Sequence, residues 1–197
     1  MPHLSQNEDM IAHTIGAILA GGSSRRMGRD KSKLIIGGTP FLERVHDTMA
    51  GVFTEVIVCG GFDVPLDGVL IPDERPGEGP VGGLLSAMRI GRGRPVFVTT
   101  VDMPLVTSEA ICAVVQPRVS GRMIRIASVA GEDQPLFGVY GPDVEPVARV
   151  AFESGKRSVL GVIEDVGQVT RIDLAPEMLL NVNTEADYER LIERHGL

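Results

Sequence analysis

The chain has few of the residues from which enzymes commonly build zinc sites or nucleophilic catalytic sites. Its 197 residues include two cysteines and four histidines. The histidines show no metal-ligand spacing, so zinc chemistry and Ser-His-Asp catalysis are both disfavoured. Cys59 and Cys112 lie in apolar surroundings, which predicts reduced thiols in a cytoplasmic protein rather than a disulfide.

Long apolar runs and an excess of positive charge are also missing. No apolar stretch reaches the roughly 18 residues of a membrane span, and the N-terminus lacks the basic and then apolar pattern of a secretory signal. We interpret residues 1–13 as a flexible tail. The formal net charge of -7 argues against nucleic-acid binding, which needs a broad basic face. We therefore expect a cytoplasmic protein with neither a membrane nor a nucleic acid as partner.

Short apolar runs alternate with amphipathic segments along the chain. Continuous apolar runs are typical of strands buried on both faces, and the alternation predicts a mostly parallel sheet with helices on each side. Strands are expected at 14–20, 55–61, 68–73, 94–102, 123–130, 134–141 and 169–174. Helices are expected at 39–53, 79–91, 108–119, 143–154, 157–166 and 184–196, with Thr39 and Thr184 as the N-caps of the first and the last. The prediction is one three-layer α/β/α domain over residues 14–197.

A glycine-rich basic loop, "GGSSRRMGRDKSK" at 21–33, follows the first predicted strand. Ligands of parallel sheets bind beyond the carboxyl ends of the strands, glycines let the backbone approach closely, and successive N–H groups cradle phosphate oxygens. The spacing matches neither G-x-x-x-x-G-K-[ST] nor G-x-G-x-x-G, which disfavours a GTPase switch and a dinucleotide oxidoreductase. We predict a loop that binds a phosphorylated ligand; a basic surface loop that contacts only water is the alternative.

Asp102 ends the predicted strand "VFVTTVD" and faces the same edge as the basic loop. A carboxylate there is suited to Mg²⁺, which would neutralise charge on a leaving pyrophosphate. Arg26 and Lys31 would screen the repulsion between two polyanions, so we expect these three residues to be catalytic. A phosphate nucleophile, with a second pKa of about 6, needs no general base. The alternative is that Asp102 only caps the helix near residue 108.

The segment "LAGGSSRRMGRDKSKL" resembles the L-A-G-G-x-S-x-R-M-G-x-D-K signature of nucleotidyltransferases, and within them the molybdenum cofactor guanylyltransferase (MobA) family. The likeness continues in "PDERPGEGPVGGLLSAM", "VTTVDMPLV", "QPLFGVY" and "LLNVNTEADYERL", and so covers nearly the whole chain. It implies the α/β/α fold of nucleotide-diphospho-sugar transferases, Mg²⁺ as cofactor, and transfer of GMP from GTP to Mo-molybdopterin.

The resemblance also implies which residues hold the nucleotide. The expected set is Leu19, Ala20, Gly21, Gly22, Lys31, Cys59, Asp73, Gly82 and Asp102. Asp73 would read the guanine edge, or would only form a turn. Cys59 stands where relatives carry a nucleotide-contacting asparagine, and a thiol is a poor hydrogen-bond partner, so guanine selection is either looser or left to Asp73 and the backbone. Gly82, near the start of a helix, either exposes N–H groups to an anion or allows close packing.

The resemblance places the molybdopterin half-site at the C-terminal part of the chain. Asn181 and Asn183 alternate along an extended segment and would face one way, toward a pterin rich in donors and acceptors. Gln134, with Pro135, and Arg157, with Lys156, are expected nearby. Asn183 could instead only introduce the last helix.

Two other functions stay open from the sequence. One is a related nucleotidyltransferase, such as a molybdopterin cytidylyltransferase or an enzyme that acts on another small phosphate; Gly21 and Gly22 favour GTP because cytidyl relatives carry Ala-Gly there. The other is a non-catalytic molybdopterin carrier, against which Arg26, Lys31 and Asp102 together argue. Proteins that deliver molybdopterin and apo-molybdoenzymes that receive the product would be transient partners.

Overall fold

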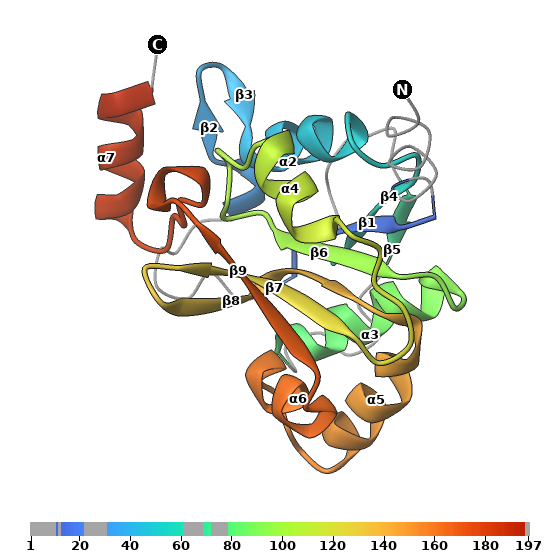
Figure 1. Ribbon diagram of the computed structural model, residues 1–197. Coiled ribbons are helices and arrows are strands. Elements are labelled where there is room, and N and C mark those ends of the chain that lie inside the picture. Colours follow the sequence, from blue (N-terminus) through green and yellow to red (C-terminus); the bar gives the residue numbers. More distant parts are fainter. Residues whose placement is uncertain (1–10, 12, 22–30, 61–68, 72–78, 196–197) are drawn as a thin grey trace, which may run out of the picture.

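A mixed seven-stranded sheet forms the centre of the computed structural model, which describes residues 11, 13–21, 31–60, 69–71 and 79–195 (Figure 1). Its strands, in spatial order, are β5 (Val69–Ile71), β4 (Val56–Cys59), β1 (Ile15–Leu19), β6 (Val96–Thr100), β8 (Glu132–Tyr140), β7 (Ile124–Val129) and β9 (Val169–Leu174). Every neighbouring pair is parallel except the two that include β8. The mostly parallel sheet that the sequence predicts is confirmed.

Helices cover both faces of this sheet. They are α2 (Phe41–Ala50), α3 (Pro80–Gly91), α4 (Ser108–Val115), α5 (Glu145–Glu153), α6 (Val159–Val166) and α7 (Glu185–His195), with short 3-10 turns η1 (Lys31–Lys33), η2 (Pro142–Val144) and η3 (Pro176–Met178). One core cluster joins α2, α4 and α7 to the sheet, and a second joins α3, α5 and α6 to its other face. The three-layer arrangement is therefore confirmed. None of the helices in the described residues is long and apolar enough to cross a bilayer.

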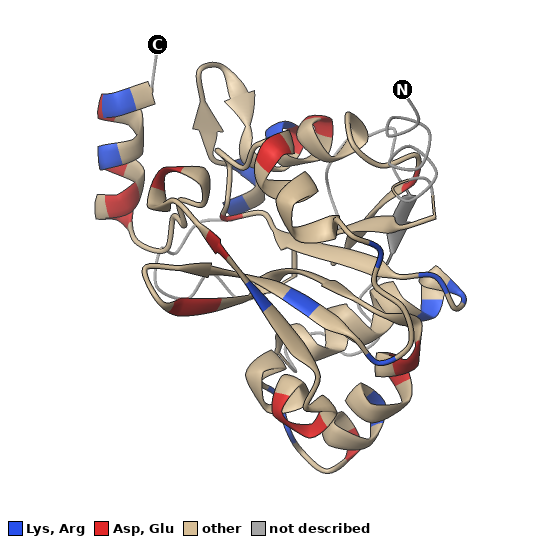
Figure 2. Ribbon diagram, viewed as in Figure 1, with Lys and Arg blue, Asp and Glu red and all other residues tan. Residues whose placement is uncertain are grey.

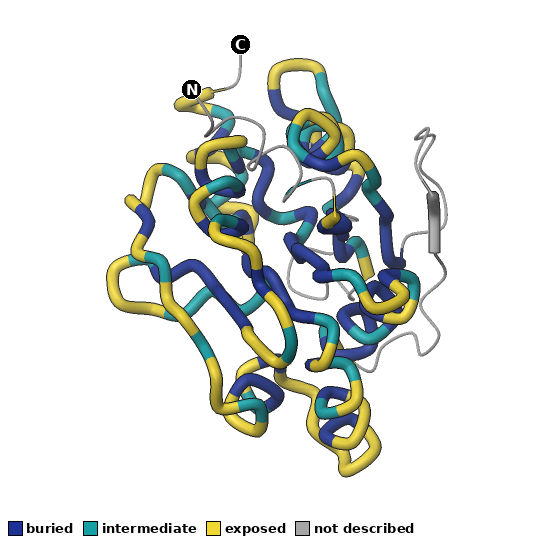
Figure 3. The backbone as a smooth tube through the Cα atoms, turned by 45° about the vertical axis from the view of Figure 1, so that its right-hand side comes forward, coloured by how far each residue is buried: buried dark blue, intermediate teal, exposed yellow. Residues whose placement is uncertain are grey.

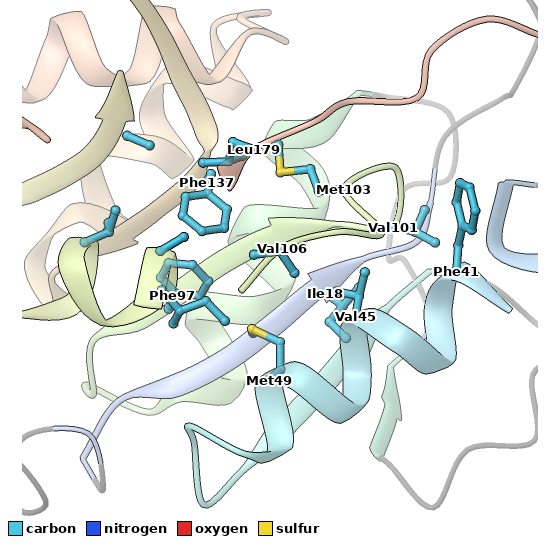
Figure 4. Close-up of a cluster of buried hydrophobic side chains, with 14 of the residues drawn as sticks. Ile18, Phe41, Val45, Met49, Phe97, Val101, Met103, Val106, Phe137 and Leu179 are labelled. Carbon is cyan, nitrogen blue, oxygen red and sulfur yellow. The ribbon is translucent and has the colours of Figure 1, made fainter. Parts of the chain in front are cut away.

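Both cores follow from the alternation of side chains along the central strands. In β1, Ile18 belongs to the cluster that includes α2. The cluster that includes α3 contains its alternate neighbours Ile15, Ala17 and Leu19. Side chains of a strand alternate between its two faces in this way. Figure 4 shows the first cluster, and Figure 3 shows the buried strands between more exposed helices. The strands β1 and β6 carry no charged residue, and the charges in Figure 2 lie on the helices, the connections and the strands β7, β8 and β9.

The predicted helix bounds differ most from the structure in α2, which ends at Ala50 rather than at 53, and in α4. Thr39 does not cap α2; it pairs with Ile36 in a hairpin of β2 (Ile35–Ile36) and β3 (Thr39–Pro40), and the helix starts at Phe41. Helix α4 ends at Val115 rather than at 119, because Pro117 has no N–H for a helix and disfavours helical geometry in the residue before it. The predicted tail at 1–13 lies outside the described residues except for positions 11 and 13.

A close backbone approach joins the end of β4 to the loop that follows β1. Gly60 has φ +80°, and a Cβ on it would lie 2.7 Å from both Cα and N of Gly21. Real Cβ atoms do not approach backbone atoms so closely, so this position needs glycine for its space as well as for its φ. Gly60 thus fixes where the chain leaves the sheet after β1.

Gly60→Ala is expected to lower the free energy of unfolding by about 2–4 kcal/mol, since steric overlap adds to left-handed strain. Gly93→Ala is the matched control, because Gly93 has φ +81° and no atom within 4 Å of its added Cβ. The control should lose only about 1–2 kcal/mol, from φ alone. Urea unfolding measures both values, and equal losses would contradict the close approach.

Candidate functional site

The carboxyl ends of β1, β4 and β6 form the edge where the predicted site residues meet. Leu19 pairs in register with Cys59 on one side and with Thr100 on the other, so the three strands end level with one another. The residues that follow them leave the sheet at one edge, where parallel sheets bind ligands. Val101 donates its backbone N–H to the Leu19 carbonyl at 3.4 Å, and Asp102 comes next.

Both carboxylate oxygens of Asp102 accept hydrogen bonds. The Thr100 hydroxyl donates to Oδ1, and the Lys31 ammonium donates to Oδ2 at 3.2 Å. The side chains of Lys31 and Asp102 are 16% and 22% exposed, so this ion pair is partly shielded from solvent and salt. The capping alternative for Asp102 is wrong, because the Thr107 side chain accepts from the Ala110 N–H at the start of α4.

The Lys31 ammonium also reaches a third segment of the chain. It donates to Oδ1 of Asn183 at 3.0 Å. The backbone of that segment is tied to the same place, because the Val182 N–H donates to the Asp102 carbonyl at 2.8 Å. We call Lys31, Asp102 and Asn183 the edge cluster. It brings together one residue from each of the basic loop, the predicted metal site and the predicted acceptor site.

The start of α7 holds Asn183 in place. Asp187 accepts from the backbone N–H groups of Asn183 and Thr184 at 3.0 and 2.8 Å, and the Thr184 hydroxyl accepts from the Asp187 N–H at 3.2 Å. This reciprocal capping confirms Thr184 as the N-cap. Partial burial acts to raise the pKa of Asp187, but hydrogen bonds with Thr184, Asn183 and Arg190 lower it to about 2. The Asp187 carboxylate is therefore charged at neutral pH. Asn183 both leads into α7 and contacts Lys31.

The loop after β1 begins with backbone contacts to β4. Ala20 donates its N–H to the Cys59 carbonyl at 2.9 Å, and Gly21 follows beside Gly60. The Cys59 side chain is 2% exposed and packs in the core cluster over α3. What Cys59 presents at the edge is therefore its carbonyl. Both cysteines are free thiols, as predicted.

Helix α3 packs in its first turn against the end of β1 with little side-chain bulk. Its N-cap, Gly79, has φ +86°. Gly82 and Gly83 are buried, and a Cβ on Gly83 would lie 3.2 Å from a methyl group of Leu19. Close helix–sheet packing therefore explains Gly83, whereas the Gly82 carbonyl accepts from the Ser86 hydroxyl at 3.0 Å within the helix. Anion binding by the first turn of α3 stays a prediction.

Asn181 and Gln134 meet next to the edge cluster. Asn181 donates from Nδ2 to Oε1 of Gln134 at 3.4 Å. Its own Oδ1 is buried and accepts no hydrogen bond from the described residues. A buried acceptor without a donor costs free energy, so this oxygen is suited to a donor group of a ligand.

Arg157 and Lys156 lie in the connection between α5 and α6. The Arg157 guanidinium sits 4.3 Å from the centroid of the Phe152 ring and donates to the Phe152 carbonyl at 2.8 Å. Its backbone oxygen lies against Gly79, at 3.1 Å from a Cβ placed there. Lys156 forms an ion pair with Asp165 at 2.6 Å. The structure thus places Arg157 beside the start of α3.

Gly22, Arg26 and Asp73 lie outside the described residues, so their expected roles stay predictions. Thr100 is the site residue that sequence reasoning missed. A signal for it exists, because residues two apart at the end of a strand share a side of the sheet, and Thr100 stands two positions before Asp102.

The chain is similar to proteins that are named for a role in the molybdenum cofactor. A protein of Mycobacterium ulcerans named "Probable molybdenum cofactor guanylyltransferase" is 36% identical, with 87% of this chain and 90% of that protein covered. The "Molybdenum cofactor guanylyltransferase" of Pseudomonas putida is 30% identical, with 72% and 78% covered. The crystal structure of molybdopterin-guanine dinucleotide biosynthesis protein A from Archaeoglobus fulgidus has a TM-score of 0.75 at 21% identity, covering 91% of this chain and 97% of that one.

The family model described as the MobA-like NTP transferase domain matches residues 16–169. This range runs from β1 to the start of β9 and includes Lys31 and Asp102. By that match, and by relatives such as the mycobacterial protein, the chain belongs to the MobA-like NTP transferase family.

Proposed function

We propose that the protein is a guanylyltransferase that moves GMP from GTP to the terminal phosphate of Mo-molybdopterin, releases pyrophosphate and forms molybdopterin guanine dinucleotide. The observation that carries the proposal is the edge cluster, in which a cation, a carboxylate and an amide from three distant segments meet at the carboxyl edge. The relatives named as molybdenum cofactor guanylyltransferases support the choice of acceptor. The reaction would take place in the cytoplasm, on a single domain over residues 14–197.

The nucleotide would lie over the ends of β1 and β4. The backbone of Leu19, Ala20 and Gly21 reaches this edge, and Lys31 supplies a positive charge beside it. The Ala20 N–H is already bound to the Cys59 carbonyl, so backbone N–H groups for phosphate oxygens would come from Gly21 onward, beside the Lys31 ammonium. Under the proposal Gly22 and Arg26 also contact the phosphates, and Asp73 selects guanine. Gly82 lines the site without side-chain bulk. Cys59 contributes through its carbonyl, which accepts from the Ala20 N–H.

Asp102 is the residue that would hold Mg²⁺. The donor set fits, since a hard carboxylate oxygen lies at the edge and already faces one cation, the Lys31 ammonium. Magnesium is commonly held in proteins by one or two carboxylates together with substrate phosphates and water, so one carboxylate is a sufficient protein contribution. When bound, the ion would supply charge neutralisation at the phosphates. Thr100 orients the carboxylate through Oδ1.

The acceptor would lie on the other side of the edge cluster, against Asn181 and Gln134, whose amides are within hydrogen-bond distance of each other. An oxygen of its terminal phosphate attacks the α-phosphorus of GTP. The bond from that phosphorus to the bridging oxygen then breaks, and the electron pair leaves with pyrophosphate. With a second pKa of about 6, the attacking phosphate is already an anion at neutral pH. The protein therefore has to align and screen two anions, which is the role of Lys31.

Pyrophosphate release with GTP, CTP, ATP or UTP, each with Mg²⁺ and with or without Mo-molybdopterin, tests the function. We expect release with GTP and only when the acceptor is present. Release with CTP instead would leave the fold and the edge cluster in place but contradict the role of Asp73 and of the Gly21–Gly22 turn. GTP binding without release would favour a carrier or another acceptor.

Asp102→Ala is expected to lower kcat/KM by about a thousandfold, because the orienting carboxylate and the predicted metal contact are lost together. Glu55→Ala is the matched control. It removes a carboxylate that pairs with Arg94 at 2.7 Å, but just before β4, at the opposite edge of the sheet. Circular dichroism would check that both variants fold. Full activity of the folded Asp102→Ala variant would contradict the mechanism.

A further inference from the structure

We infer that Asn183 is a positioning residue for Lys31 and so serves nucleotide binding rather than acceptor binding. The inference rests on the proposed function and assigns different tasks to the two asparagines of "NVNT". Asn181 is left for the second substrate. Asn183 belongs to the nucleotide half, because its side-chain oxygen is already engaged by the Lys31 ammonium.

The hydrogen bonds of the Lys31 ammonium fix its orientation. A lysine ammonium has three N–H donors and no acceptor. Two of these donors point at Oδ2 of Asp102 and Oδ1 of Asn183, at 3.2 and 3.0 Å. With two directions set, the direction of the third is also set, and since no residue in the described ranges accepts from it, this donor is available to a phosphate oxygen. A flexible side chain that loses its rotamer freedom before the ligand arrives loses less on binding.

Asn183 can do this because its own backbone is held from both sides. Val182 is bound to the Asp102 carbonyl, and the Asn183 N–H is bound by Asp187 in the first turn of α7. A second tie joins the same helix to the segment after Lys31, since the Tyr188 hydroxyl donates to the Ile35 carbonyl at 2.8 Å. Helix α7 and the η1–β2 segment are therefore connected at two points, and Oδ1 of Asn183 is a fixed acceptor.

The contrast with Asn181 makes the assignment specific. Asn181 contacts Gln134 rather than Lys31, and its buried Oδ1 accepts nothing from the described part of the chain. If both asparagines served only the second substrate, replacing either would leave GTP binding unchanged. If Asn183 acts through Lys31, its replacement must weaken GTP binding even when no acceptor is present.

The test is calorimetric titration of GTP with Mg²⁺, without acceptor, into the full-length wild type and four variants. These are Asn183→Ala, Asn181→Ala, Lys31→Met and the double variant Lys31→Met/Asn183→Ala. We expect Asn183→Ala to raise the Kd about tenfold, the size of one hydrogen bond to a charged group. Asn181→Ala should not change it. The double variant should bind like Lys31→Met alone, because interacting residues are not additive.

Asn183→Asp keeps the size of the side chain and guards against a folding defect in the alanine variant. Its carboxylate would draw Lys31 away from the phosphates and repel them, so we expect a larger loss of GTP affinity that shrinks at high salt. An unchanged Kd in folded Asn183→Ala or Asn183→Asp, or equal losses in the presence and absence of Lys31, would overturn the inference while leaving the proposed function standing. A wild type that binds no GTP would instead overturn the proposed function.

Discussion

One ammonium group, held between a carboxylate and an amide, is the interaction on which the site depends. Lys31 connects the end of the basic loop, the end of β6 and the start of α7. The pair with Asp102 is partly shielded from solvent, so its orientation survives better than that of a surface ion pair. Without this connection the three segments would share an edge of the sheet but would have no fixed relation to one another.

The sheet explains why those segments arrive at one place. The strands β1, β4 and β6 are parallel, and Leu19, Cys59 and Thr100 lie side by side at their ends. The central strands β1 and β6 carry no charged residue, so the charged groups near them lie at the strand ends and in the connections (Figure 2). Close approaches such as that of Gly60 to Gly21 then bring loop backbones together. The α/β core thus gathers polar groups at one edge, while the buried guanidinium of Arg125 in β7 donates to the Val114 and Pro117 carbonyls.

Sequence reasoning predicted much of this because parallel strands share an edge. Asp102 after an apolar strand and Lys31 in a glycine-rich loop were both expected there, and the structure puts them in contact. The contact between Lys31 and Asn183 could not be predicted from the sequence, because the two residues are 152 positions apart and no periodic pattern relates them. The resemblance implies that Cys59 lies at the nucleotide, but the pleat turns its thiol into the core. Thr39 reads as a helix cap locally, yet pairing with Ile36 takes it into a hairpin.

A crystal structure with a non-hydrolysable GTP analogue and Mg²⁺ would test the central claim most directly. The account predicts phosphate oxygens within hydrogen-bond distance of the Lys31 ammonium, the metal on Asp102, and Lys31 still in contact with Asn183. Phosphates bound away from Lys31, or a metal held without Asp102, would contradict it.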